Sequence, residues 1–540
     1  MNPTDPKENQ ATTDTPSTAG FSSSAMDIPP APQPIPSSTP APSPVAPAPS
    51  TDTTTLPAPE PSPVPSTAAP LTQPSTLTPP SSLHEPGIVT PKSGSKIPKG
   101  PIVFVLILVF LILGIFSFAK FVLPKITGGL GTKATTITWW GVWEDPKTIQ
   151  PLIDEYQASH KGVTVKYVQV AKDQYRERLS NAIAGGQGPD IMTIHNSWVP
   201  MFRTSLSPMP TSVFSPQEFQ QTFYPVMSRD LTLGTSIVGI PTEYDGLGLF
   251  VNDDIFGTYG KTVPTTWNDL RNTAISLTIK NQQGIIQQAG VAMGTTSNVD
   301  HWQETLALLI LQNGAKLETP TGSLAEGALD FYTAFYKTDK VWDDTLPNST
   351  TMFANGKLAM MIAPSWRAHD IIAQSPTLKF RVLPVPQLPK NTPDEPDITY
   401  ATYWANAVSS KSAVQPAAWE FLKFLSTKES YQKLYDNAVK LRTFGEPFPR
   451  VDMRDSITAD PKVGGFISLA GNAKSWYLDG RTFDGETGIN SRMAKYFEDA
   501  INMVNNTSGG NSKNALTTAA NGVLQVLVDY GLAQAPAPVK

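Results

Sequence analysis

The chain has 540 residues and a formal net charge of −5, with 52 prolines and no cysteine. The absence of cysteine excludes disulfides, thiolate metal sites and cysteine nucleophiles. The small acidic excess argues against a general nucleic-acid-binding protein, whose footprint is basic. Composition changes strongly along the chain, because residues 1–100 hold 25 of the prolines and all eleven tryptophans lie between Trp139 and Trp476. Folded structure is therefore expected in the C-terminal three quarters.

Residues 1–100 form a leader rich in Pro, Ser and Thr, with Phe21 as its single aromatic residue. Such a segment cannot bury enough apolar surface to offset the conformational entropy that is lost on ordering. Residues 29–80, with their PAP and PSP steps, favour extended polyproline II backbone. We predict a disordered leader that acts as a spacer, with a ligand for other modules as the alternative.

A hydrophobic segment follows the leader. Residues 102–119 carry no charge, and the 22 residues of 102–123 would span roughly 33 Å as a helix, enough for a bilayer core. A secretory signal is usually shorter and nearer the N-terminus, so cleavage after Ala119 is the alternative. Three lysines flank each side, and the positive-inside rule therefore assigns no orientation. We predict a transmembrane helix over 101–123 and a linker over 124–134.

From residue 135 onward the pattern alternates between strands and helices. Residues 136–140 and 163–170 are typical of strands, and 146–159 of an amphipathic helix between them. A helix over 173–184, capped by Asp173, and a buried strand over 191–194 complete a βαβαβ series. Such a series predicts a parallel α/β sheet, whose ligands bind at the carboxyl ends of the strands.

Five sequence motifs then occur in a fixed order along residues 135–530. They are GPDI at 188–191, GIPTEYDG with FVNDDIF at 239–256, VPTTWNDL at 263–270, FANGKLAMM with PSWR at 353–367, and WEFLKFLS at 419–426. Together they resemble the family 1 extracellular solute-binding proteins of ABC importers, the maltose- and oligosaccharide-binding type. One such motif is a weak signal, whereas five collinear motifs are specific.

The resemblance implies an α/β, two-lobed periplasmic-binding-protein-like fold (type II), which closes on its ligand about hinge segments. The solute-binding domain would cover 135–540, with lobe 1 at 135–243 and 400–455 and lobe 2 at 247–398 and 460–530. The implied function is to capture a carbohydrate outside the cytoplasm and deliver it to the transmembrane subunits of an ABC permease. Because no cysteine can carry a lipid anchor, the predicted helix would hold the protein at the cell membrane in a single pass, with the binding domain outside.

Sugars present an apolar face of C–H groups and a rim of hydroxyls, so a sugar site needs aromatic rings beside carboxylates, amides and arginines. Residues of these types follow the predicted strands and occupy the predicted hinge. The candidate ligand-binding residues are Trp143, Glu144, His195, Asn196, Trp198, Tyr244, Asp245, Trp366, Arg367, Tyr403 and Trp404. By resemblance, Asp245 stands where the maltose type has a hinge carboxylate. Trp366 stands near its stacking tryptophan, although this chain has Pro-Ser-Trp in place of Pro-Trp.

No catalytic motif accompanies these residues. The chain has no Ser/His/Asp order, HExxH, P-loop or dinucleotide fingerprint, and nothing marks a pair of carboxyls as those of a glycosidase. We therefore predict a monomeric binding protein that is not an enzyme, needs no metal or cofactor and binds no nucleic acid. The alternatives are a surface sensor or adhesin ectodomain without a transport role, and a secreted carbohydrate-active enzyme.

Overall fold

The computed structural model describes residues 134–390, 392–506 and 510–535. These ranges hold all eleven tryptophans. The predicted leader and transmembrane helix, and the predicted linker except its last residue, lie outside them. Within the described ranges, every helix is too short or too polar to cross a bilayer.

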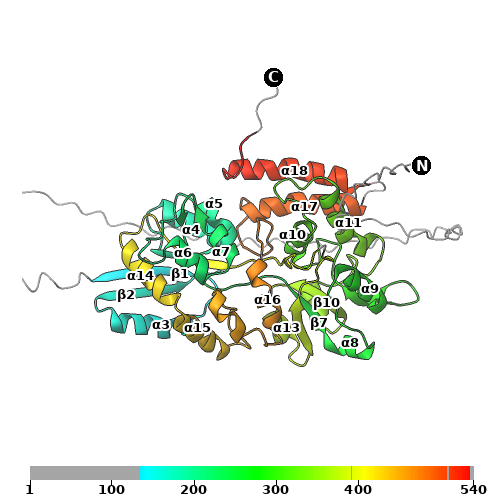
Figure 1. Ribbon diagram of the computed structural model, residues 1–540, viewed down its shortest axis with the longest axis horizontal. Helices are drawn as coiled ribbons and strands as arrows, with labels where there is room; N and C mark the ends of the chain where they lie inside the picture. Colours follow the sequence, from blue (N-terminus) through cyan, green and yellow to red (C-terminus); the bar gives the residue numbers. More distant parts are fainter. Residues whose placement is uncertain (1–133, 391, 507–509, 536–540) are drawn as a thin grey trace, which may run out of the picture. The chain divides into compact units, whose positions relative to one another are not determined.

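Two five-stranded sheets form the centres of two α/β lobes (Figure 1). The first has the order β2-β1-β3-β12-β6, in which β1 lies parallel to β2 and β3 while β12 is antiparallel to β3 and β6. The second has the order β11-β7-β10-β9-β8, in which β9 and β10 are parallel. The strands are β1 (Thr135–Gly141), β2 (Val163–Gln169), β3 (Ile191–His195), β6 (Ile240–Pro241), β7 (Gly248–Asn252), β8 (Ile279–Lys280), β9 (Ile286–Val291), β10 (Leu358–Ala363), β11 (Phe380–Pro384) and β12 (Trp404–Val408). The predicted two-lobed α/β architecture is present.

Two helices cover the first sheet where the βαβαβ pattern predicts them. Helix α3 (Pro146–Ser159) begins after Asp145, whose carboxylate accepts a backbone N–H at 2.8 Å. Its apolar stripe is buried and consists of Ile149, Leu152, Ile153 and Tyr156. Helix α4 (Tyr175–Ala184) begins two residues later than predicted, because Gln174 adopts a left-handed backbone with φ 59° and no side chain caps the helix. The predicted capping role of Asp173 is therefore wrong.

The remaining helices pack around the two sheets. In the C-terminal part, α17 and α18 lie side by side and pack on α11 (Figure 1). These helices are η3 (Asn196–Trp198), α5 (Val199–Phe202), α6 (Pro216–Thr222), α7 (Pro225–Asp230), α8 (Asp253–Thr258), α9 (Trp267–Leu277), α10 (Trp302–Gln312), α11 (Ser323–Lys337), α12 (Ser349–Ala354), α13 (Arg367–Gln374), α14 (Gln415–Leu425), α15 (Lys428–Val439), η4 (Val451–Ser456), α16 (Gly464–Ile467), η5 (Ala470–Asn472), α17 (Ile489–Asn506) and α18 (Ser512–Asp529). A short hairpin of β4 (Thr232–Leu233) and β5 (Ser236–Ile237) follows α7.

Connecting segments carry the chain from one lobe to the other. One joins β6 to β7 through residues 242–247, and another joins β11 to β12, with described residues 385–390 and 392–403. The two segments hydrogen-bond to each other, since the N–H of Leu247 donates to the carbonyl oxygen of Tyr400 at 3.0 Å. The lobes are therefore joined by paired extended backbone, which can bend without breaking either sheet.

Gly246 lies where the two crossing segments come closest. It forms a bridge with Ala401, and a Cβ at position 246 would lie 2.3 Å from the carbonyl oxygen of Tyr400. Replacing Gly246 with Ala should separate the segments and lower the free energy of unfolding by about 1–3 kcal/mol, the usual cost of overpacking. Chemical denaturation checks this against Gly257→Ala in α8, where a Cβ meets no atom within 4 Å. Equal stability of the two variants would contradict the expected clash.

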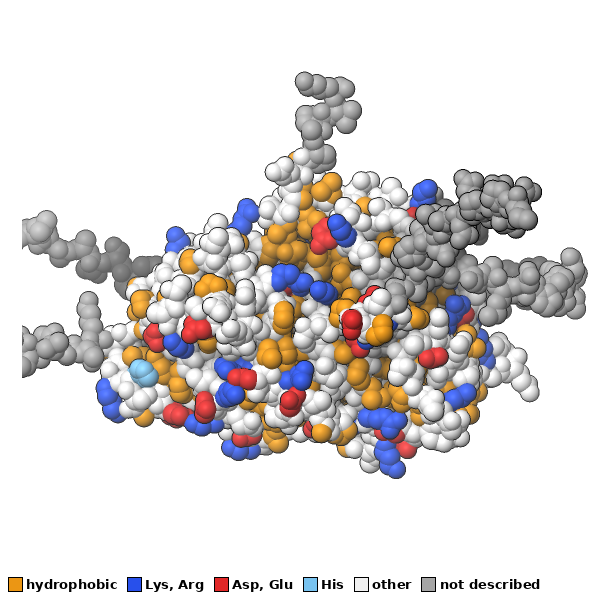
Figure 2. All heavy atoms as spheres, viewed as in Figure 1, with side chains coloured by type: hydrophobic (Ala, Val, Ile, Leu, Met, Phe, Trp, Pro, Cys, Tyr) orange, Lys and Arg blue, Asp and Glu red, His pale blue; other side chains and the backbone are white. Residues whose placement is uncertain are grey.

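Charged side chains are mixed on the surface. On the face seen in Figure 2, lysines and arginines are interspersed with acidic residues. Many of the ion pairs are exposed, such as Lys433 with Glu155 at 2.7 Å. Surface pairs of this kind contribute about 0–1 kcal/mol, so the stability of the fold comes mainly from the apolar side chains buried against the two sheets.

Candidate functional site

A cavity of about 500 Å³ lies between the two lobes, beside the crossing segments. It opens at the carboxyl ends of β1 and β3, where open α/β sheets bind ligands, and its volume is typical of a small-molecule site. It also extends into the first lobe, where Ile149, Leu422, Leu425 and Leu434 line it. Its charged wall consists of Glu144, Glu243, Asp245, Glu304, Asp370 and Glu446 together with Lys172, Arg367, Arg442 and Arg481.

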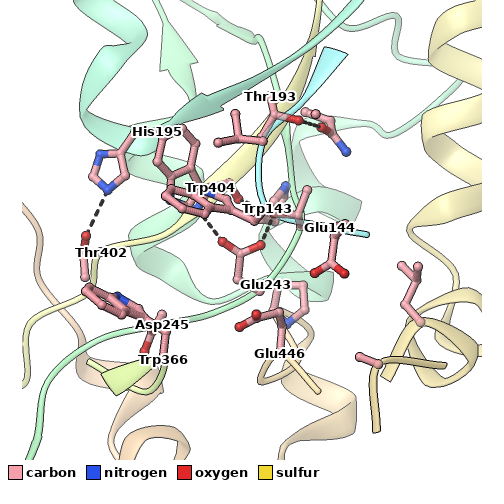
Figure 3. A pocket seen from close by; sticks show the side chains of 18 of the residues that line it. Trp143, Glu144, Thr193, His195, Glu243, Asp245, Trp366, Thr402, Trp404 and Glu446 are labelled. Atoms are coloured by element: carbon pink, nitrogen blue, oxygen red, sulfur yellow. Dashed lines mark hydrogen bonds between the residues drawn. The ribbon is translucent and has the colours of Figure 1, made fainter. Parts of the chain in front are cut away.

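Seven of the eleven candidate binding residues line this cavity. They are Trp143, Glu144, His195, Asp245, Trp366, Arg367 and Trp404. Figure 3 shows Trp143, Trp404, Glu243 and Glu144 on one side, and Asp245 and Trp366 nearby. The structure therefore brings together residues that are more than 200 positions apart in the sequence. The other four candidates are buried and do not line the cavity.

Asn196 and Tyr403 hold the first lobe together. The side-chain amide of Asn196 donates to Asp230 at 3.0 Å, and its Oδ1 accepts the N–H of Tyr403 at 3.2 Å. The hydroxyl of Tyr403 donates to the same Asp230 oxygen at 3.1 Å. The polar groups of both side chains form their hydrogen bonds inside the protein, so a ligand in the cavity does not reach them.

Trp198 and Tyr244 are also fully buried. Trp198 lies behind Trp404, with ring centroids 5.3 Å apart, and so supports that ring from the core. Adjacent residues on extended backbone point to opposite faces, so that Asp245 faces the cavity whereas Tyr244 faces the interior. In the same way, Trp404 faces the cavity whereas Tyr403 faces the interior. The sequence identified the correct segments, and the alternation of side chains along each segment decides which of two adjacent residues reaches the cavity.

Aromatic rings from both lobes face the cavity (Figure 3). Trp143 is 39% exposed, and its ring meets that of Trp404 edge to face at 5.3 Å. Phe483 adds a further ring 5.8 Å from Trp143. On the side of the second lobe, the guanidinium of Arg367 lies 4.2 Å from the ring centroid of Trp366. Apolar ring surface is thus available to a bound molecule from more than one direction.

Three carboxyl groups gather near one guanidinium, that of Arg442. Its Nη1 lies 2.9 Å from Glu446 and its Nη2 lies 3.4 Å from Glu144. Glu243 instead accepts the backbone N–H of Trp404 at 2.7 Å. Burial raises the pKa of Glu144 to about 7 and raises the pKa of Glu243 well above its usual range. Glu144 therefore titrates near neutral pH.

Asp245 links the first crossing segment to the second lobe. Its Oδ1 accepts the N–H of Gly246 at 2.7 Å and the N–H of Ser365 at 2.9 Å. Burial, with Glu446 nearby, raises the pKa of Asp245 to about 8. At neutral pH this carboxyl is mainly protonated, so that it can donate as well as accept a hydrogen bond.

His195 lines the cavity, but both of its nitrogens are occupied. Nδ1 accepts from the hydroxyl of Ser197 at 2.7 Å and from its N–H at 3.4 Å, which assigns the ring proton to Nε2. Nε2 then donates to the hydroxyl of Thr402 at 2.9 Å (Figure 3). Burial lowers the pKa of His195 to about 3. The ring is therefore neutral and holds Thr402 in place at the cavity wall.

In the second lobe, Arg367 is the centre of a hydrogen-bonded network. Its guanidinium pairs with Asp300 at 3.0 Å and with Asp370 at 2.9 Å, and its Nε donates to Nε2 of His301 at 2.9 Å. The other nitrogen of His301 lies 3.2 Å from Oε1 of Glu304. This network fixes the guanidinium against the ring of Trp366, and it brings Glu304 to the cavity wall.

Several residues of the wall were missed by the sequence analysis. They are Lys172, Glu243, Glu304, Arg442, Glu446, Arg481 and Phe483. Glu304 lies in the first turn of α10, where polar residues are common, and its burial to 1% exposure is set by contacts that the local sequence does not indicate. Arg481 and Phe483 have left-handed backbone, with φ of 58° and 55°, in a loop that no motif marks.

A family model and curated relatives match this chain in sequence. Residues 140–432, more than half of the chain, match the family model described as bacterial extracellular solute-binding protein. A protein of Brucella abortus (strain 2308) with the name "putative binding protein" is 23% identical over 296 residues, which cover 52% of this chain and 69% of that protein.

Solved structures share the fold. The sugar-binding protein MalE from Xanthomonas citri has a TM-score of 0.59 at 18% identity, covering 73% of this chain and 98% of that chain. A cyclo/maltodextrin-binding protein complexed with maltotetraose has a TM-score of 0.58 at 18% identity, covering 74% and 98%. A solute-binding protein of an ABC transporter from Thermotoga lettingae, bound with α-D-tagatose, has a TM-score of 0.55 at 20% identity, covering 73% and 100%. The two-lobed fold is thereby confirmed, and the match over 140–432 shows that this chain belongs to the bacterial extracellular solute-binding protein family.

Proposed function

We propose that the protein captures a carbohydrate between its two lobes and delivers it to the transmembrane subunits of an ABC permease. The observation that carries this proposal is the cavity wall, where the rings of Trp143, Trp366 and Trp404 stand beside carboxyl groups. Sugar rings stack on aromatic faces through their C–H groups and hydrogen-bond to carboxyls through their hydroxyls. Similar structures contain maltotetraose, α-D-tagatose and cycloalternan, which supports this ligand class.

Binding would proceed through closure of the lobes. A sugar first meets the exposed ring of Trp143 on the first lobe. Bending of the crossing segments then brings Trp366 and the Arg367 network over its other side. A ligand that contacts both lobes favours the closed form, because its affinity for that form is higher. The permease would recognise the closed form, and no covalent step is needed, as expected for a binding protein that is not an enzyme.

The proposal also includes a tether to the membrane. The apolar segment at 101–123 would cross the bilayer once, with the binding domain on the extracellular side. The Pro-rich leader would then lie on the opposite side. This topology keeps a captured solute close to its permease in a chain that has no cysteine for a lipid anchor.

Calorimetry of the full-length protein in detergent tests the proposed ligand class. We expect saturable binding of at least one carbohydrate from a panel of monosaccharides, maltose- and mannose-type oligosaccharides and polyols, at one molecule per chain. Tryptophan fluorescence should change in parallel, because Trp143 loses its exposure to water on binding. Failure of every carbohydrate, together with binding of a peptide or an amino acid, would contradict the proposal.

A further inference from the structure

We propose that the carbohydrate bound in this cavity carries a positive charge, as an amino sugar does. This inference rests on the proposed function and names the class of its ligand. The ionisable residues of the wall comprise six acidic and four cationic side chains. The contacts of each acidic group show which of them lacks a partner.

The cationic side chains of the wall already have partners. Arg442 pairs with two carboxylates, as described above. Arg367 and Arg481 both pair with Asp300, at 3.0 Å and 2.9 Å, and Asp300 lies behind the wall with 1% of its side chain exposed. Lys172 lies 5.5 Å from the ring centroid of Phe483.

Three carboxyl groups of the wall are left without a cationic partner among the described residues: Glu243, Asp245 and Glu304. Each is at most 9% exposed. Burial raises the pKa of Glu243 and of Asp245, and each accepts hydrogen bonds from two donors, so that neither needs a cation to be buried. Glu304 differs from them, because one of its oxygens has no donor among the described residues.

Among the described residues, Glu304 is the acidic side chain of the wall with a buried, unpartnered oxygen. Its Oε1 accepts the N–H of Gly480 at 2.8 Å. It also accepts from His301, whose ring is neutral because Arg367 donates to its other nitrogen. Oε2 of Glu304 has no hydrogen-bond partner within the described part of the chain, although it is buried at the cavity wall. This oxygen requires a donor that the described residues do not supply.

The surroundings of Glu304 are rich in acceptors. Oε1 of the adjacent Gln303 also lacks a partner in the described ranges. Both side chains face Gly480, where a Cβ would lie 3.1 Å from Gln303 Oε1 and 3.3 Å from Oε2 of Glu304. Asp479 is 3% exposed, and burial together with the charge of Glu304 raises its pKa well above its usual range. A group that enters here meets hydrogen-bond acceptors without donors, together with the charge of Glu304, and is favoured if it brings donors and positive charge.

An ammonium group meets both requirements. It presents three donors and no acceptor, whereas a sugar hydroxyl brings one donor and no charge. The rings of Trp143 and Trp404 line the same cavity, and they attract a cation through their faces as readily as they stack on a sugar. A sugar that bears an amine therefore complements the wall better than its neutral counterpart.

Matched pairs of sugars test the inference on the full-length protein by calorimetry. The pairs are glucosamine and glucose, galactosamine and galactose, and the β-1,4-linked dimers of glucosamine and of glucose, with N-acetylglucosamine as an uncharged analogue. We expect the amino sugar of at least one pair to bind at least tenfold more tightly than its neutral partner, and salt to reduce this preference. Tighter or equal binding of the neutral sugars overturns the inference but leaves the proposed function intact. Absence of binding by sugars of either kind overturns both.

Glu304→Gln tests the residue assignment. Glutamine keeps the oxygen that accepts from Gly480 and His301, and replaces the unpartnered oxygen by an amide group of the same size. The preference for the amino sugar should fall to less than twofold. Glu429→Gln, an exposed position in the first turn of α15 and outside the cavity, is the matched control and should keep the full preference. An unchanged preference in Glu304→Gln would overturn the role of this carboxylate.

Discussion

Trp143→Ala should weaken carbohydrate binding by about 10- to 100-fold and leave the stability of the protein nearly unchanged. The ring is 39% exposed, so its removal leaves no cavity in the core. A ligand that covers roughly 60–100 Å² of this ring gains about 1.5–2.5 kcal/mol from apolar burial, before any specific stacking term is added. Since 1.4 kcal/mol corresponds to a factor of ten, the loss of this surface alone gives the expected range.

Calorimetry with the best ligand of the carbohydrate panel measures this effect, and thermal unfolding measures stability. Tyr259→Ala is the matched control, because Tyr259 is an aromatic residue of similar exposure, 44%, that does not line the cavity. It should keep the affinity of the unaltered protein. If Trp143→Ala binds as tightly as Tyr259→Ala, the ligand does not use the aromatic side of the cavity, and the proposed binding mode is wrong.

The parts of the fold that the sequence predicted are those with local signals. The apolar stripe of α3 and the alternation along β1 and β2 need no distant contacts to be recognised, and the structure has these elements at nearly the predicted bounds. Trp143 and His195 were candidates because they lie at or just beyond the carboxyl ends of β1 and β3. The two-lobed arrangement itself came from the collinear motifs, because short strands alone do not specify how two sheets are joined.

The rest of the site depends on contacts between distant segments. Glu304 accepts a hydrogen bond from a residue 176 positions away, so nothing near it in the sequence indicates that it faces the cavity. Arg442 meets Glu144 across 298 positions. Phe483 reaches the cavity because its backbone is left-handed, a conformation that residues other than glycine rarely adopt. The sequence therefore gives no sign of this turn at position 483. Contacts between distant segments bring these residues to the cavity, whereas local sequence patterns are enough to predict the strands around it.

Arg442→Met should lower the free energy of unfolding by about 1–3 kcal/mol at pH 8. Arg442 is the cation that Glu144 and Glu446 share, and its loss leaves both carboxylates in the cavity without a counter-charge. Breaking a buried ion pair costs about 3–5 kcal/mol, and breaking an exposed pair costs about 0–1 kcal/mol. The side chains of Arg442 and Glu144 are each 27% exposed, which places this pair between the two limits.

The effect should depend on pH in a direction that the pKa of Glu144 determines. This pKa is about 7 in the folded protein against an ordinary value of 4.5, so the folded state holds a proton that the unfolded state has lost. Stability from this group is therefore present below pH 4.5 and decreases as the pH rises toward 7. Arg442 lowers the pKa of Glu144, so its removal raises that pKa further and extends the decrease above pH 7.

Urea denaturation at pH 5 and pH 8 measures this difference. At pH 5 Glu144 is protonated in both proteins, so Arg442→Met should lose less stability there than at pH 8. Arg442→Lys keeps the charge and should recover part of the loss. Lys433→Met removes the cation of the exposed pair with Glu155 and should change stability by less than about 1 kcal/mol at either pH. An equal loss in Arg442→Met at both pH values would mean that the packing of its side chain, and not its charge, stabilises the cavity wall.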